Sequence, residues 1–321
     1  MILAADIGGS KTRVGLFDRD LNLIRLRVVA TPRDPTPDSI PETLIRTADE
    51  VSGEIKSEVT AFGVASMGPI DVKRGTIVKT PTVGAENVPL IERLKEWLEV
   101  EYFLANDCNA AAYAEWWSLR NDGVSSLVYI TISTGIGGGA VVDDCLLLGK
   151  DGNAAEVGHI VLDHEGYMRC GCGGLGHWEA YCSGRNVVRF AKRLYDDGFI
   201  SPMTRLAESI ERDELSSERI FELQRAGDAG AVELLERVAV FNAAGISSVI
   251  ATYDPHVIVM GGSVVLNNFD FFVSEVFPLI ERYSVIERPE IVRPVHNDLS
   301  PLMGAAMIAR HRLEKAIPRR V

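Results

Sequence analysis

Residues 2–17 read ILAADIGGSKTRVGLF, and this stretch decides the fold class. The apolar runs at 2–7 and 12–17 predict two strands joined by a short turn. That turn, Gly8-Gly-Ser-Lys11, contains two glycines, which let backbone N–H groups approach an anion closely, and its hydroxyl and lysine add donors. A turn of this composition is also typical of an ordinary hairpin. The pattern therefore indicates a strand-rich start and does not decide whether the turn binds an anion.

The chain that follows alternates helices with strands. Apolar residues recur at helical spacing between 44 and 55. The further expected elements are strands at 23–29, 59–65, 102–105 and 256–260, and helices at 90–98, about 229–252 and about 304–313. Such a sequence predicts an α/β fold, in which mixed sheets are covered by helices.

The opening pattern occurs a second time near Ser126. An apolar strand at 127–132 is followed by a turn at 135–139, Gly-Ile-Gly-Gly-Gly, and by a returning strand at 140–142. The two copies share little sequence identity, and glycine-turned hairpins are common. The pattern alone therefore leaves open whether the second copy is an internal duplication.

Length and charge limit the classes of function. The chain has 321 residues, which suggests two domains. Its net charge of −12 provides no general attraction for nucleic acid or anionic lipid. No signal-peptide pattern follows Met1, and the longest uncharged stretch, 238–253, is too short and too polar to span a bilayer. We expect a cytoplasmic protein without a nucleic-acid or membrane partner.

Two more glycine turns follow apolar strands, Ser133-Thr-Gly-Ile-Gly-Gly-Gly139 and Met260-Gly-Gly-Ser263. None of the three turns matches a Walker loop or the dinucleotide-binding fingerprint in its usual setting. Each turn alone is most simply a hairpin. Together with Asp6 at the end of the first strand, they indicate a nucleotide held between two domains.

Asn106 and Asp107 stand where a predicted strand ends and an alanine-rich helix begins. Either residue is a suitable N-cap for that helix, which is a structural role. A carboxylate at this place could also accept a proton from a substrate hydroxyl, as a general base does. The residues alone leave both interpretations open and favour the cap.

The most specific segment is Glu156-Val-Gly-His159, followed by Cys170-Gly-Cys-Gly-Gly-Leu-Gly-His177-Trp-Glu179. Two thiols and two imidazoles fit a tetrahedral zinc ion, and the glycines allow the chain to wrap around it. The predicted ligands are His159, Cys170, Cys172 and His177. The alternative is free thiols near two surface histidines. Cys182 and His164 lie outside this set, and we expect neither to bind metal.

These segments together resemble the ROK family of sugar kinases and sugar-responsive repressors, within the actin-like ATPase superfamily. The resemblance covers almost the whole chain, and the order and spacing of the segments make it specific. It rests on Asp6-Ile-Gly-Gly-Ser-Lys11, Gly63-Val-Ala-Ser-Met-Gly-Pro69, Asn106-Asp107, Ser133–Gly139, Glu156–His159, the Cys-x-Cys segment, Met260-Gly-Gly262 and Gly304-Ala-Ala306.

The resemblance implies two actin-like (ribonuclease H-like) domains with an active-site cleft between them. The N-terminal domain would be 1–107, completed by the C-terminal helix at about 304–321, and the larger domain, 108–303, would carry the zinc loop. The implied activity is ATP-dependent phosphorylation of a hexose at its 6-hydroxyl, with glucose as the first expected substrate. The implied cofactors are ATP, Mg²⁺ and a structural Zn²⁺, and the implied assembly is a homodimer or homotetramer.

The resemblance also implies roles for individual residues. Asp107 would be the catalytic base. The substrate-binding residues would be Asn106, Glu156, His159, Glu179, Ser66 and Gly68. The nucleotide and its magnesium would be bound by Asp6, Gly8, Gly9, Ser10, Lys11, Thr134, Gly135, Gly261 and Gly262. His159 would serve twice, with one ring nitrogen on zinc and the other toward the sugar.

Two departures from the family pattern affect these expectations. His177 replaces a usual third cysteine, and imidazole remains an acceptable zinc ligand. Thr82 follows Pro81 where many hexokinase-like members have a sugar-binding Asn. A hydroxyl cannot reproduce an amide's paired donor and acceptor, so an N-acetylhexosamine such as N-acetylmannosamine is the alternative substrate.

Two non-catalytic functions are less favoured. Family regulators carry a helix-turn-helix before the core, whereas the core pattern here begins at residue 2. The presence of Asp107 argues against a catalytically silent sugar sensor.

Overall fold

The computed structural model describes residues 1–33, 36–80 and 83–312. Contacts divide the chain into two compact units. The first comprises Met1–Tyr129, Gly139–Ala155 and Pro294–Val321, and the second comprises Ile130–Gly138 and Glu156–Arg293. The expected domain boundary after Asp107 falls inside the first unit by this division and stays a prediction. Thr82 lies outside the described residues, as does the expected end of the C-terminal helix.

The first unit is built on a five-stranded mixed sheet with the order β3-β2-β1-β4-β8. β1, β4 and β8 are parallel to one another, and β2 and β3 are antiparallel to their neighbours. The strands are β1 (Ile2–Ile7), β2 (Lys11–Phe17), β3 (Leu23–Ala30), β4 (Ala61–Ser66) and β8 (Glu101–Asn106). The five strands expected in this part of the sequence are confirmed. Every residue of β1 and β4 is buried, because helices cover both faces of the sheet.

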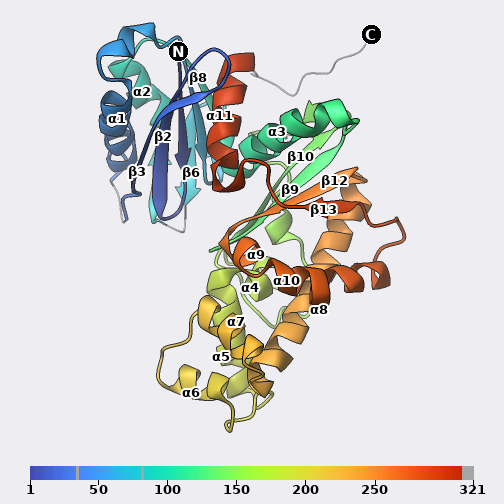
Figure 1. Cartoon of the computed structure of the whole chain (residues 1–321). Coiled ribbons are helices and arrows are strands. Elements are labelled where there is room, and N and C mark those ends of the chain that lie inside the picture. Colours follow the sequence, from blue (N-terminus) through green and yellow to red (C-terminus); the bar gives the residue numbers. More distant parts are fainter. Residues whose placement is uncertain (34–35, 81–82, 313–321) are drawn as a thin grey trace. The chain divides into compact units, whose positions relative to one another are not determined.

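Helices cover this sheet on its two sides, α1 (Ser39–Ser52) and α2 (Leu90–Trp97) on one and α11 (Ser300–His311) on the other (Figure 1). Alternate residues of β1, such as Leu3 and Ile7, share a core with Leu44 of α1. The other face needs a glycine, because a Cβ on Gly63 would lie 2.0 Å from the carbonyl oxygen of Ala305 in α11.

A small antiparallel sheet, β5-β6-β7, follows β4 in the chain and was not expected. Its strands are β5 (Ile70–Asp71), β6 (Thr76–Thr80) and β7 (Ala85–Val88). Two of these strands have four residues or fewer, too short for a period-2 pattern to stand out.

A second five-stranded sheet has the order β11-β10-β9-β12-β13. Its strands are β9 (Leu127–Ile132), β10 (Ile136–Val142), β11 (Cys145–Leu146), β12 (Val257–Gly261) and β13 (Glu290–Val292). The expectation that the turn extends to Gly139 is wrong, because β10 already begins at Ile136. Gly139 instead allows β10 to approach α3 (Asp107–Leu119) closely, because a Cβ there would lie 2.2 Å from the carbonyl oxygen of Cys108.

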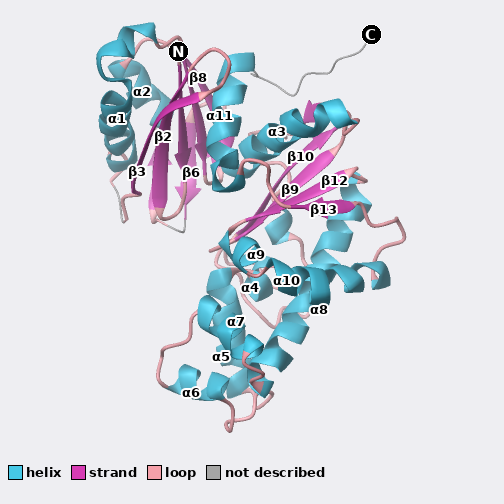
Figure 2. Ribbon diagram, viewed as in Figure 1, coloured by secondary structure: helices cyan, strands magenta, loops and turns pink. Residues whose placement is uncertain are grey.

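Apart from its strands, the second unit is mainly helical (Figure 2). Its helices are α4 (Glu179–Cys182), α5 (Gly184–Asp196), α6 (Arg205–Glu211), α7 (Ser217–Arg225), α8 (Ala229–Tyr253), α9 (Ser263–Asn267) and α10 (Phe269–Phe271). The expected long helix is confirmed as α8. Its N-cap is Asp228, whose side chain accepts the N–H of Ala231 at 3.0 Å. Among the described residues α8 alone is long and apolar enough to cross a membrane, and 61% of its most apolar window is buried in the protein.

Gly304 of α11 supports a stability prediction. A Cβ at this position would lie 1.8 Å from the carbonyl oxygen of Ala110 in α3, and backbone atoms cannot move aside as a side chain does. We expect Gly304→Ala to lower the free energy of unfolding by about 1–3 kcal/mol or more, despite the higher helix propensity of alanine. Chemical denaturation checks this. Unchanged stability would mean that α3 and α11 lie further apart than described.

Candidate active site and metal centre

Three of the segments singled out in the sequence meet at one edge of the first sheet. In the parallel register, Ile7 pairs with Ser66, and Ser66 pairs with Asn106. Asp6, Ser66 and Asn106 therefore stand at the carboxyl ends of neighbouring strands, the edge at which α/β sheets bind ligands. Asp107 follows directly, as the first residue of α3.

The glycine turn after β1 is held by its own backbone. Gly8 donates its N–H to the carbonyl of Lys11 at 3.0 Å, and its own carbonyl accepts the hydroxyl of Thr31 at 2.7 Å. Ser10 and Lys11 are exposed, whereas Asp6 is buried. The turn thus presents a hydroxyl and a cation to solvent beside a buried carboxylate, which suits an anionic ligand with a bound cation.

Arg13 was not predicted as part of this site, yet it contacts Asp6. β1 and β2 pair Asp6 with Arg13, whose Nη1 donates to Oδ2 of Asp6 at 2.9 Å while Nη2 donates to Oδ2 of Asp298 at 2.8 Å. Burial raises the pKa of Asp6 to about 7, the carboxylate of Asp107 adds to the rise, and Arg13 opposes it. Arg13 could have been identified from the hairpin register, because that register pairs it with Asp6. The contact with Asp298 could not, because Asp298 is distant in sequence.

The structure separates the two roles considered for Asn106 and Asp107. Oδ1 of Asn106 accepts the N–H groups of Cys108 at 2.9 Å and Asn109 at 3.2 Å, so Asn106 is the N-cap of α3. Asp107 is half-buried, and its Oδ1 also accepts the N–H of Cys108, at 2.8 Å. Burial raises the pKa of Asp107, and the hydrogen bond from Cys108 opposes that rise. A carboxylate with a raised pKa is better suited to accept a proton.

The predicted substrate residues Ser66 and Gly68 differ in exposure. Ser66 is fully buried at the end of β4, and its hydroxyl donates to the carbonyl of Met67 at 3.0 Å. Gly68 is partly exposed and is joined to Pro69 by a cis peptide bond. Gly68 is therefore the one of the two that solvent reaches.

In the second unit, the predicted nucleotide residues gather where β9 and β12 end. Gly262 has a φ of +88°, and a Cβ there would lie 2.4 Å from the carbonyl oxygen of Ile132. Thr134 is exposed, and Gly135 lies against Glu179, because a Cβ on Gly135 would be 2.6 Å from Oε2 of that carboxylate. The glycine turns of the second unit therefore lie side by side.

His159, Cys170, Cys172 and His177 form a compact cluster, in which the four ligand atoms lie within 4.8 Å of one another. The Nδ1 atoms of the two histidines are 3.2 Å apart, and Nδ1 of His177 is 3.3 Å from Sγ of Cys172. Nδ1 of His159 is 3.8 Å from Sγ of Cys172 and 3.9 Å from Sγ of Cys170. Tetrahedral zinc bonds require about 3.3 Å between two nitrogens and about 3.6 Å between nitrogen and sulfur, so the donors fit that ion.

Local backbone geometry builds this cluster. Gly173 and Gly176 have φ values of +97° and +69°, which other residues rarely adopt. The N–H of Cys170 donates to the carbonyl of Gly174 at 2.8 Å and closes the tight loop that contains Cys172. Cys182 and His164 lie outside the cluster.

Two predicted sugar-binding carboxylates adjoin the cluster. Oε2 of Glu156 is 3.9 Å from Nε2 of His159, the ring nitrogen that does not face the cluster. Glu179 accepts the thiol of Cys170 through Oε1 at 3.3 Å and the N–H of Ile136 through Oε2 at 2.9 Å. Burial, and then the charge of Glu179, raise the pKa of the Cys170 thiol to about 12. A bound cation would favour the thiolate instead.

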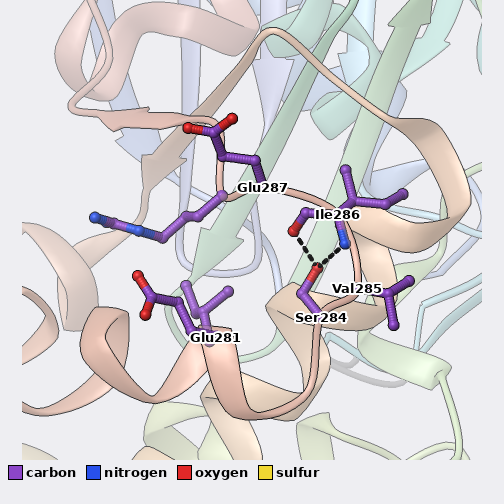
Figure 3. A pocket seen from close by; sticks show the side chains of 7 residues that line it. Glu281, Ser284, Val285, Ile286 and Glu287 are labelled. Atoms are coloured by element: carbon purple, nitrogen blue, oxygen red, sulfur yellow. Dashed lines mark hydrogen bonds between the residues drawn. The ribbon is translucent and has the colours of Figure 1, made fainter.

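A separate hollow of about 280 Å³ in the second unit is lined by residues 280, 281 and 284–288 (Figure 3). None of the predicted site residues lies in it. The hydroxyl of Ser284 is used within its own loop, since it donates to the carbonyl of Ile286 at 2.7 Å and accepts the Ile286 N–H at 3.2 Å. We assign this hollow no part in the site.

The class of protein that fits these features is the actin-like, nucleotide-dependent enzymes. The features are mixed sheets flanked by helices, glycine turns at strand ends in both units, and a half-buried aspartate at one of those ends. The predicted fold class is confirmed. The chain belongs to the ROK family, whose pattern it matches over residues 2–312.

Named relatives and solved structures agree with this membership. The chain is 38% identical to a glucokinase of Aeropyrum pernix over 317 residues, 96% of each chain. It is 30% identical to an N-acetylmannosamine kinase of Salmonella heidelberg, over 96% of this chain and 98% of that one. A ROK hexokinase from Thermus thermophilus superposes with a TM-score of 0.81 at 32% identity, covering 98% and 99% of the two chains. A ROK glucokinase from Streptomyces griseus, in complex with glucose and AMPPNP, has a TM-score of 0.76 at 28% identity, covering 97% and 99%.

Proposed function

We propose that this protein transfers the γ-phosphoryl group of ATP to the 6-hydroxyl of a hexose, and that glucose is its preferred substrate. The observation that carries the proposal is the placement of Asp107. It lies at the carboxyl-end edge of the first sheet, close enough to Asp6 for the two charges to interact, with a cap supplied by its neighbour Asn106 and a raised pKa. Glucokinase relatives support the choice of sugar.

In this mechanism Asp107 is the general base. The sugar hydroxyl oxygen forms a bond to the γ-phosphorus, the bond from that phosphorus to the departing ADP oxygen breaks, and Asp107 takes the hydroxyl proton. Asn106, Gly68, Glu156, His159 and Glu179 are proposed to orient the sugar, and Ser66 to support the Gly68 backbone. Positioning of this kind supplies a large part of the rate in phosphoryl transfer.

The nucleotide is proposed to lie against the glycine turns. Gly8, Gly9, Ser10, Lys11, Thr134 and Gly135 would bind its phosphates, and Gly261 and Gly262 its adenosine. Asp6 suits a magnesium ion, because Mg²⁺ prefers carboxylate oxygen and Asp6 and Asp107 are close enough for their negative charges to interact. When bound, the magnesium would neutralise charge on the phosphates.

The cluster of His159, Cys170, Cys172 and His177 is proposed to hold one structural zinc ion. Its distances match a closed tetrahedral set of four protein ligands, which leaves no position for substrate. Binding through Nδ1 of His159 would fix the tautomer and leave Nε2 for the sugar. The zinc would fold the loop and orient His159 and Glu179.

The second candidate substrate is an N-acetylhexosamine. It is favoured by the similarity to N-acetylmannosamine kinases and by Thr82 in place of the usual amide. A panel of hexoses and N-acetylhexosamines, measured by coupled ADP release, separates the two. The highest kcat/KM for glucose supports the proposal, and a higher value for N-acetylmannosamine replaces it with the second candidate.

The raised pKa of Asp107 predicts the pH dependence of the reaction. A general base must be deprotonated, so activity is lost as the pH falls through its pKa. Burial shifts that pKa upward, and the acid limb of kcat/KM should therefore lie above the ordinary aspartate range of about 4. A pH–rate profile measures the limb. An acid limb near 4 would contradict the assignment.

We further propose that the enzyme acts in the cytoplasm, as a homodimer or homotetramer, without nucleic-acid or membrane partners. The net charge of −12 supports the last point.

A further inference from the structure

Residues 151–153 contact the chain segments next to two proposed sugar-binding residues, Gly68 and Asp107, although no local sequence pattern marks them. Within the first unit, they contact the start of β5, two residues after Gly68. The N–H of Val72 donates to the carbonyl of Asp151 at 3.2 Å. Gly152 permits the approach, because it has a φ of +98° and a Cβ there would lie 2.3 Å from Cγ2 of Val72.

Asn153 makes the most specific of these contacts. Its Oδ1 accepts the N–H of Ile70 at 2.8 Å, and its Nδ2 donates to the carbonyl of the same residue at 2.7 Å. One side-chain amide thus satisfies both backbone groups of Ile70, as a neighbouring strand would. Few other side chains combine a donor and an acceptor in this way.

The same segment also contacts the first turn of α3. Nδ2 of Asn109 donates to the carbonyl of Gly152 at 3.2 Å, and the N–H of Asn109 is capped by Asn106. Asn109 is completely buried, and its Oδ1 has no partner among the described residues. An unpaired buried acceptor lowers stability, so stability alone does not explain this amide.

The chain leaves the first unit immediately after these contacts, since Ala155 is the last residue of this stretch and Glu156 is the first residue of the longer stretch of the second unit. Ala155 has a φ of +63°, a left-handed conformation that is uncommon for alanine. Strain of this kind persists where the surroundings determine the backbone, and it is common near functional sites. The backbone that delivers Glu156 is therefore tightly specified.

We propose that Asn153 is a positioning residue for the sugar. It fixes the segment that follows Gly68 to the segment that precedes Glu156, while Gly152 ties the same segment to the helix of Asp107. Two segments of the first unit that are far apart in sequence, the one after Gly68 and the start of α3, are thereby joined by one short stretch that leads directly to Glu156. This inference rests on the proposed function, because it assumes that Gly68, Asp107 and Glu156 act on the sugar.

The test compares steady-state kinetics of the wild type, Asn153→Ala and Asn153→Asp on the full chain. Alanine removes both hydrogen bonds. Aspartate keeps the acceptor for the Ile70 N–H but places a second oxygen, which cannot donate, against the Ile70 carbonyl. We expect both variants to raise the KM for glucose by about tenfold to hundredfold and to leave the KM for ATP within about twofold. The matched control is Asn268→Ala, which also removes an amide that donates to a backbone carbonyl (Val264, 2.9 Å) and accepts from a side chain (Arg225, 3.0 Å).

Thermal unfolding of all four proteins separates positioning from folding. The inference is supported if the Asn153 variants raise the KM for sugar but not for ATP, and if Asn268→Ala does not raise it even when its melting temperature falls by a similar amount. If Asn153→Ala does not fold, Asn153→Asp decides by the same criterion. An unchanged sugar KM, or equal rises for sugar and ATP, overturns it and leaves Asn153 as a structural residue. A wild type that phosphorylates no sugar of the panel overturns the proposed function and this inference together, and is recognised because it appears without any substitution.

Discussion

Replacing Asp107 with Asn should reduce kcat by about 10²–10⁴-fold, the usual contribution of a general base. The amide has the shape of the carboxylate and can still accept the N–H of Cys108, which is 2.8 Å from Oδ1. The start of α3 and the binding of sugar should therefore survive, since the cap is provided by Asn106. Only the proton acceptor is lost. Steady-state kinetics and isothermal titration with glucose measure the two effects separately.

The control for this experiment is Asp38→Asn, which makes the same chemical change elsewhere in the first unit. Asp38 precedes α1 and pairs with Arg93 at 2.8 Å on the surface, where an ion pair contributes little. Its kcat should stay within about twofold of the wild type. If Asp107→Asn kept more than about a tenth of wild-type turnover, Asp107 would be part of the helix start and not the base.

The strands at the proposed site could be predicted because each is a short apolar run that ends at a turn. β1 and β4 are buried over their whole length, and their hydrophobicity is visible without any partner. The cluster of two histidines and two cysteines was also predictable, because its four members lie within 19 consecutive residues and their spacing is local. Local chemistry of this kind is present in the sequence itself.

Other parts depend on contacts between distant segments, which no local pattern records. Glu115 lies in the middle of α3 and is completely buried, where a charged residue is not expected. Its carboxylate accepts the N–H groups of Val295 at 2.7 Å and His296 at 3.2 Å and the hydroxyl of Ser300 at 2.7 Å, so it fixes the entry to α11. The contacts of Asn153 could not be predicted for the same reason, because its partner Ile70 is 83 residues away in the sequence.

Removing one zinc ligand should have the largest effect on stability. Cys172→Ser replaces a thiolate with a weakly coordinating hydroxyl, and we expect bound zinc to fall from about one per chain to near zero. Structural zinc contributes roughly 10–16 kcal/mol of apparent binding free energy in small domains, and in this protein that energy would be coupled to folding of the glycine-rich loop. The melting temperature should fall, and the affinity for sugar should fall with it.

The loss of sugar affinity follows from which residues the cluster holds. His159 contributes Nδ1 to the cluster and directs Nε2 toward Glu156, and Glu179 touches Cys170 at 3.3 Å. Without the ion these three side chains lose their common support. A closed site has no Lewis-acid role, so the fall in kcat at saturating sugar should be smaller than the rise in KM.

Two control variants make the metal experiment specific. His177→Cys should keep the ion, because thiolate is an equally good fourth ligand. Cys145→Ser removes a thiol that lies outside the cluster and should change neither zinc content nor sugar affinity. Elemental analysis of the purified proteins gives the metal per chain, and titration with glucose gives the affinity. A wild type that never carries near-stoichiometric zinc but phosphorylates sugar normally would show that this loop is stable through its glycine turns and hydrogen bonds alone, and that the two thiols and two imidazoles meet without holding a metal.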